Sequence, residues 1–146
     1  MLSNKKYNNK ITSLRFNQDS SLFIISNNVG FTVYQCDGCV KKLTRCLNTK
    51  LRFIEMLYSC NIFSLSGSNE SDYSDNKLII WDDHKKQKNG EIKFRDTIKN
   101  TILCRDKVIV NTSLAVYLYS LDKLDLIDRF DTYEQLNEHL ISLSFS

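Results

Sequence analysis

The chain has 146 residues, which is enough for one or two domains with a buried core. Hydrophobic residues make up 42%, aromatic residues 11% and charged residues 25%, a composition that excludes a disordered or fibrous chain. Twenty Lys and Arg against 17 Asp and Glu leave a net charge of +3, too small and too scattered for a nucleic-acid-binding protein. The apolar runs, such as Leu22 to Ile25, are too short to cross a bilayer.

The N-terminal residues and the cysteines predict a cytosolic protein. No apolar stretch follows the basic residues Lys5 and Lys6, so a secretory signal is not expected. The five cysteines are an odd number in a chain without such a signal, and we expect reduced thiols rather than a disulfide framework.

Short apolar segments rich in β-branched and aromatic residues recur along the chain and predict β-strands. Clusters of Asn, Asp, Ser and Lys separate them and are expected to form the turns, since the chain has no proline. Only residues 132–139 have the spacing of a short helical turn. The predicted strands fall into three groups of four: Ile11 to Phe16, Leu22 to Ser26, Phe31 to Gln35 and Val40 to Cys46; Phe53 to Tyr58, Ile62 to Ser66, Lys77 to Trp81 and Glu91 to Arg95; Thr101 to Arg105, Val108 to Val110, Ala115 to Tyr119 and Leu124 to Phe130.

The chain also repeats itself. The segment ITSLRFN at its start reappears at its end as LISLSFS, which places Leu14 and Leu143 at equivalent positions, 129 residues apart. This separation equals three units of about 43 residues, and four-stranded propeller blades repeat every 40–45 residues or so. Met56 and Leu103 fall near the two intermediate positions. The sequence therefore predicts one propeller domain over residues 1–146, with blades at about 11–46, 52–96 and 100–131 and the start of a fourth at about 140–146.

Two long polar loops distinguish the second predicted blade. The first, 67–76, is acidic and rich in serine, and we expect it to be exposed to solvent. The second, 82–90, ends in Asn89-Gly90, a strong hairpin signal that places the turn at these two residues. Its lysines suit contact with an anionic membrane surface, although such a run is more often a solvated loop.

The sequence offers few groups for chemistry. Cys36 and Cys39 have the spacing of a zinc-binding pair, but no second pair follows, so Asp37-Gly38 is expected to form a tight turn and no metal site is predicted. Trp81 stands where WD repeats place a Trp-Asp dipeptide and is expected to pack between blades. Since the sequence has no nucleophile elbow, phosphate loop or HExxH motif, neither catalytic residues nor a cofactor are predicted.

Two stretches resemble a known family. LRFNQDSSLF at 14–23, followed by GFTVY at 30–34, is similar to the first blade of the PROPPINs, the WD40-like propellers that include the WIPI proteins. NTIL at 100–103, VIV at 108–110 and VYLYSLD at 116–122 are similar to the third blade. The resemblance implies an all-β, WD40-like β-propeller. It would be a partial seven-bladed ring of about three four-stranded blades plus the first strand of a fourth.

The resemblance also implies a function. PROPPINs are non-catalytic scaffolds that bind phosphatidylinositol 3-phosphate and 3,5-bisphosphate on membranes and recruit autophagy factors. Their lipid site uses a paired-arginine motif in blades five and six, and this chain has no Arg-Arg pair, so no phosphoinositide-binding residue is expected in it. The implied location is cytoplasmic and peripheral, at autophagosomal precursor or endosomal and vacuolar membranes. The alternative is a general WD40-type protein–protein interaction scaffold without lipid recognition.

The family docks the lipid-transfer protein of autophagy on blades one to three. Asn17 and Asp19 occupy the Asn-x-Asp turn of that surface and are therefore the predicted partner-binding residues. Both residue types also form turns on their own, and the two roles are compatible. The Pro-Arg element of some relatives is absent, and acidic residues at 70, 72 and 75 stand near its place. Open propeller edges also predict self-association, or pairing with further chain.

Overall fold

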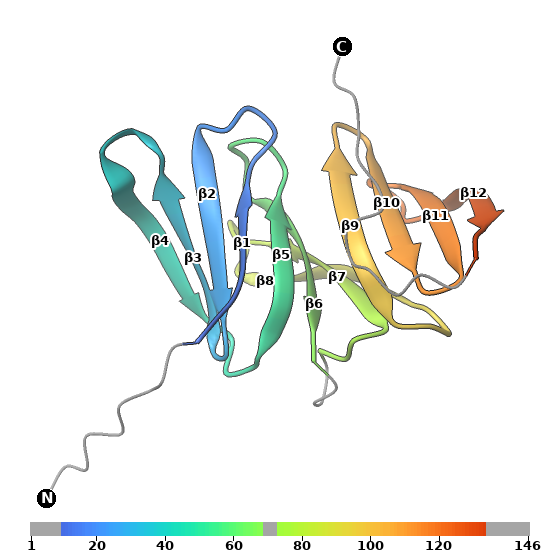
Figure 1. The fold of residues 1–146 in the computed structure, drawn as a ribbon. Coiled ribbons are helices and arrows are strands. Elements are labelled where there is room, and N and C mark those ends of the chain that lie inside the picture. The colour runs from blue at the N-terminus through green and yellow to red at the C-terminus, as the bar shows by residue number, and fades with distance from the viewer. Residues whose placement is uncertain (1–9, 69–72, 134–146) are drawn as a thin grey trace, which may run out of the picture.

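Three four-stranded antiparallel sheets make up the computed structural model, which describes residues 10–68 and 73–133 (Figure 1). This confirms the predicted all-β class and the grouping of the strands in fours. Most of the helical turn predicted at 132–139, from residue 134 onward, and the predicted strand at 140–146 lie outside the described residues. The first sheet contains β1 (Ile11–Phe16), β2 (Leu22–Asn27), β3 (Gly30–Gln35) and β4 (Val40–Cys46); the second contains β5 (Leu51–Met56), β6 (Ile62–Gly67), β7 (Lys77–Asp82) and β8 (Gln87–Lys93); the third contains β9 (Ile98–Cys104), β10 (Lys107–Thr112), β11 (Ala115–Ser120) and β12 (Leu126–Asp131).

Within each sheet the strands follow chain order from one edge to the other. The first strands, β1, β5 and β9, come next to one another, as in the inner ring of a propeller (Figure 1). Each sheet then packs face to face on the next. The described part of the chain thus contains one four-stranded unit three times.

Two apolar clusters fill the spaces between the sheets. Phe31 from the first sheet and Phe63 from the second are both fully buried, with ring centroids 5.0 Å apart. Trp81 belongs to the same cluster, which confirms its predicted place between two sheets. The second cluster joins the other pair of sheets, where the ring of Phe94 lies 4.9 Å from that of Tyr117.

A partly buried ion pair adds a polar connection between the first two sheets. Arg45 on β4 donates from Nε and Nη2 to the two carboxylate oxygens of Asp83, at 2.6 and 2.9 Å. Trp81 donates from its indole nitrogen to the same carboxylate at 3.3 Å. Planar two-point pairing of this kind fixes orientation as well as distance, so it holds the two sheets in register.

The turn predicted at Asn89-Gly90 is wrong. Both residues lie inside β8, and the chain turns earlier, over residues 83–86. Asp82 fixes that turn because its Oδ1 accepts hydrogen bonds from the backbone N–H groups of His84 and Lys85, at 2.9 and 3.2 Å. Gly90 lies close to the turn between β11 and β12, since a Cβ there would lie 2.5 Å from the Cδ1 atom of Leu124, at the flexible end of that side chain.

Residues 73–76 of the acidic loop are less exposed than expected. Asn76 exchanges hydrogen bonds with the backbone of Phe94, and the carbonyl of Asp75 accepts from the N–H of Ile98 at 2.9 Å. The ring of Tyr73 packs against the first apolar cluster. Residues 73–76 therefore connect the second sheet to the start of the third, and the prediction of a solvated loop is wrong for them.

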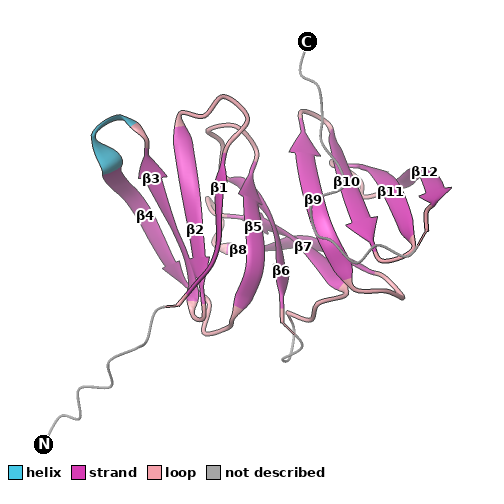
Figure 2. Cartoon of the chain, viewed as in Figure 1, coloured by secondary structure: helices cyan, strands magenta, loops and turns pink. Residues whose placement is uncertain are grey.

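The predicted turn at Asp37-Gly38 is present as a short 3-10 helix, η1 (Asp37–Cys39), between β3 and β4 (Figure 2). Gly38 adopts a left-handed φ of 69°, which glycine permits without strain. Throughout the described ranges 10–68 and 73–133, no helix has the length and apolar character needed to cross a membrane.

Candidate partner-binding surface

The turn between β1 and β2 holds the two residues predicted to bind a partner. Asn17 begins it and Ser20 closes it, with the Ser20 N–H donating to the Asn17 carbonyl at 3.1 Å. Ser20 has a left-handed φ of 59°. The polar residues of this segment thus form the turn that their types predict.

Asn17 is only 4% exposed, and its side chain is fully used inside the protein. Its Oδ1 accepts from the N–H of Leu22 at 3.0 Å, while its Nδ2 donates to Ser21 Oγ and to the carbonyl of Tyr58, both at 3.1 Å. Tyr58 belongs to the second sheet's turn, 41 residues further along the chain. Asn17 therefore shapes the turn and joins it to the neighbouring sheet.

Gln18 extends this connection to the third sheet and was not predicted from the sequence. Its Nε2 donates to the carbonyl of Leu103 at 3.0 Å, and its Oε1 accepts from the N–H of Tyr58. One side chain thus bonds to the backbone of both other sheets. The turn and the ends of β5 and β9 consequently form one continuous surface.

Asp19 is the member of the predicted pair that faces solvent. Its Oδ1 accepts from the hydroxyl and the N–H of Ser21, at 2.6 and 3.0 Å. These hydrogen bonds hold the pKa of the Asp19 carboxyl below its usual value, so it is ionised at neutral pH. A fixed negative charge on a rigid turn is available to a partner. The structure does not test that contact, and the partner-binding role of both residues stays a prediction.

A groove opens between the second and third sheets at the same end of the strands. It has a volume of about 330 Å³ and is lined by Ile62, Ile80, Asn89, Arg105, Asp106, Leu121 and Asp122. Three of these side chains are aliphatic, and Arg105, Asp106 and Asp122 are exposed around them. The N–H of Leu121 donates to the carbonyl of Asp106 at 2.8 Å, which ties the two turns of the third sheet together. An apolar groove with charges of both signs at its rim suits an amphipathic helix.

No family model matches the chain. It is 33% identical over 124 residues to Autophagy-related protein 18e of Arabidopsis thaliana, an alignment that covers 82% of this chain and 33% of that protein. Hsv2 of Kluyveromyces lactis shares its fold with a TM-score of 0.76 at 24% identity, over 86% of this chain and 37% of that one. The chain is a homologue of the PROPPIN β-propellers.

The same architecture occurs in a PROPPIN that was solved with a partner. KlAtg21, in complex with the coiled coil of AgAtg16, superimposes with a TM-score of 0.72 at 25% identity, over 84% of this chain and 39% of that one. The present chain spans about a third of the length of the curated relatives that it matches. Its three sheets thus correspond to part of a PROPPIN propeller.

Proposed function

We propose that the three sheets serve as the partner-binding part of an autophagy-related, non-catalytic propeller scaffold. The groove lined by Ile62, Ile80, Leu121 and Arg105 is the observation that carries this proposal. Its aliphatic side chains suit the apolar face of a helix, and its charged rim suits the polar flanks. A PROPPIN homologue solved with a coiled coil supports this choice of partner class.

Phosphoinositide recognition belongs to this proposal as a property of the whole scaffold rather than of these residues. The sequence has no Arg-Arg pair to grip a phosphorylated headgroup bidentately. In the cell, the chain would reach autophagosomal precursor or endosomal and vacuolar membranes together with a lipid-binding part. The alternative is a protein–protein scaffold without lipid recognition. It would use the same groove, but the assembled scaffold would not bind liposomes.

Reversing the charge of Arg105 tests the groove. Arg105→Glu is expected to reduce capture of an Atg16-type coiled coil about tenfold or more, because it places a negative charge at the rim without changing a buried side chain. Arg95→Glu is the matched control, since Arg95 is also exposed but follows β8 at the opposite end of the sheets. Equal capture by the two variants in a quantitative pull-down would reject the groove.

The turn at Asp19 is tested by removing its charge alone. Asp19→Asn keeps an oxygen that can accept the Ser21 hydrogen bonds, so the turn should persist. Capture of the autophagy lipid-transfer protein is expected to fall about threefold to tenfold, the contribution of one charge at an interface rim. Asp37→Asn, in the exposed turn of the same sheet, should leave capture unchanged. Undiminished capture by Asp19→Asn would remove Asp19 from the proposed surface.

A further inference from the structure

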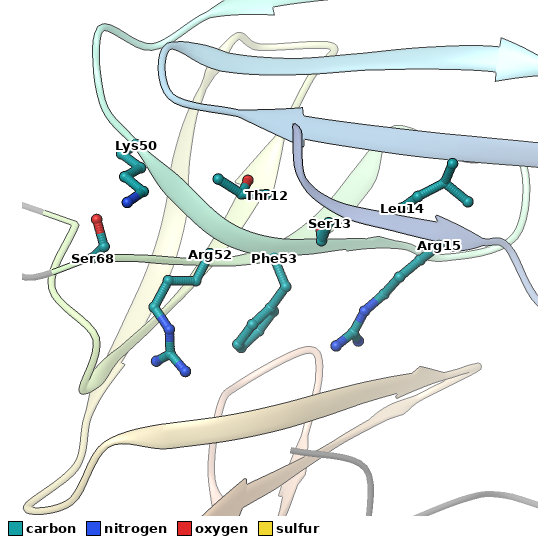
Figure 3. A pocket seen from close by; sticks show the side chains of 8 residues that line it. All are labelled: Thr12, Ser13, Leu14, Arg15, Lys50, Arg52, Phe53 and Ser68. Carbon is teal, nitrogen blue, oxygen red and sulfur yellow. The ribbon is translucent and has the colours of Figure 1, made fainter. Parts of the chain in front are cut away.

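A second cavity lies between the inner strands β1 and β5, away from the groove. It has a volume of about 560 Å³ and is lined by Thr12, Ser13, Leu14, Arg15, Lys50, Arg52, Phe53 and Ser68 (Figure 3). Three of the eight lining residues are cationic, and none of the eight is acidic. The hydroxyl groups add further polar atoms to its wall.

β-Bulges explain why so many polar side chains reach this cavity. The pairing of β1 with β2 shifts register between Ile11 and Ser13, and the pairing of β5 with β6 shifts at the equivalent place, between Leu51 and Phe53. A bulge aims two successive side chains at the same face of a sheet. In β1 both Thr12 and Ser13 accordingly reach the hydroxyl of Ser26 on β2, at 2.8 and 2.6 Å.

In β5 the corresponding bulge places Arg52 beside Phe53 on the face toward the third sheet. Arg52 donates from Nη1 to the carbonyl of Ile98 at 2.8 Å, and Arg15 donates from Nη1 to the carbonyl of Thr101 at 3.2 Å. The two guanidinium groups point the same way on either side of the Phe53 ring, 5.0 and 5.8 Å from its centroid (Figure 3). Backbone carbonyls and an aromatic ring thus hold both cations in place before any ligand arrives.

Two further charged side chains lie close to this arrangement. Glu55 lies beyond Arg15, with its Oε2 3.9 Å from Arg15 Nη1. Lys50 is exposed at the mouth of the cavity. Arg15 on β1 and Lys50 and Arg52 at the start of β5 bring three positive charges to one cavity, which favours a bound anion.

We propose that this cavity binds a soluble, multiply charged phosphate compound. Guanidinium groups pair with phosphate oxygens at two points, and lysine acts on phosphate as a point charge. A volume of about 560 Å³ accommodates several phosphate groups rather than a single small ion. Arg15 and Arg52 would hold the inner phosphate groups, Lys50 would neutralise the outermost one, and the Thr12 and Ser13 hydroxyls would complete the wall.

Calorimetric titration of the chain with inorganic tripolyphosphate at low ionic strength tests the site. Lys50→Gln is expected to weaken binding about tenfold, the loss of one charge-assisted hydrogen bond, and because Lys50 is exposed the variant should fold normally. Lys93→Gln is the matched control, since it removes a lysine that is also exposed, from β8, the outermost strand of the second sheet, and should bind like the parent chain. Arg52→Gln, checked for folding by circular dichroism, should weaken binding further.

Vesicles containing phosphatidylinositol 3-phosphate distinguish a soluble ligand from a lipid headgroup. The proposal expects titratable binding of tripolyphosphate and no retention of the chain on these vesicles. Absence of tripolyphosphate binding, or equal weakening in Lys50→Gln and Lys93→Gln, would overturn it. Lys50-dependent retention on vesicles without tripolyphosphate binding would also overturn it, in favour of a headgroup.

Discussion

The Glu55→Gln variant is expected to be more stable than the parent chain at pH 8, by up to about 3 kcal/mol, and nearly equal to it at pH 4.5. Glu55 lies on β5 with a side chain only 12% exposed, and its Oε2 is buried without a hydrogen-bond partner in the described part of the chain. Burial raises the pKa of Glu55 to about 7, although the charge of Arg15 and the N–H of Leu103 act in the opposite direction.

The direction of this pH dependence follows from whether the folded or the unfolded chain holds the Glu55 proton. The folded protein keeps the Glu55 proton up to about pH 7, whereas the unfolded chain releases it near its ordinary pKa of 4.5. The contribution of the Glu55 carboxyl to the free energy of unfolding is therefore fully present below pH 4.5 and is lost as the pH rises through 7. Glutamine has a similar shape and never ionises, so it removes the cost of a buried charge at high pH.

Urea unfolding of both proteins between pH 4.5 and 8.5 measures this difference. Glu91→Gln is the control, because Glu91 has a side chain 49% exposed and pairs with Lys77 only at the surface, at 3.8 Å. A constant offset between the Glu55 variant and the parent at every pH would contradict a buried, titrating carboxyl.

Local sequence signals predicted the parts of this fold that depend on neighbouring residues. Alternating apolar residues and Asn, Asp and Ser turns placed the strands within a few residues, apart from β8. The turn at Gly38 was predictable for the same reason, since left-handed backbone favours glycine wherever it occurs. The Trp-Asp dipeptide likewise placed Trp81 between two sheets.

Contacts between residues that are distant in the chain gave no such local signal. Gly90 looked like a turn residue, but it lies inside β8 with the Leu124 side chain close by. Gln18 carried no signal because its partner Leu103 is 85 residues away. Glu55 has no neighbour in the sequence that signals its burial, which comes from the packing of β1 and β9 on β5. A single sequence gives no local signal for such contacts, because they form only when the chain folds.

The largest loss of stability is expected from Phe63→Ala. Phe63 is fully buried between the first two sheets and packs against Phe31, so truncation removes aromatic contacts and leaves a cavity that two rigid sheets cannot close. Such substitutions cost roughly 3–5 kcal/mol, a large share of the roughly 5–15 kcal/mol that stabilises a typical domain.

Phe130→Ala is the matched control, because Phe130 is 55% exposed on the edge strand β12 and should cost less than about 1 kcal/mol. Urea unfolding gives both values. Amide hydrogen exchange adds a second readout, because the first sheet depends on this cluster for its only large apolar contact among the described residues. Protection in β2 and β3 should therefore fall with the global stability of Phe63→Ala. If those strands keep their protection while the second sheet loses its own, the two sheets are not held together through Phe63, and the packing described for this cluster is wrong.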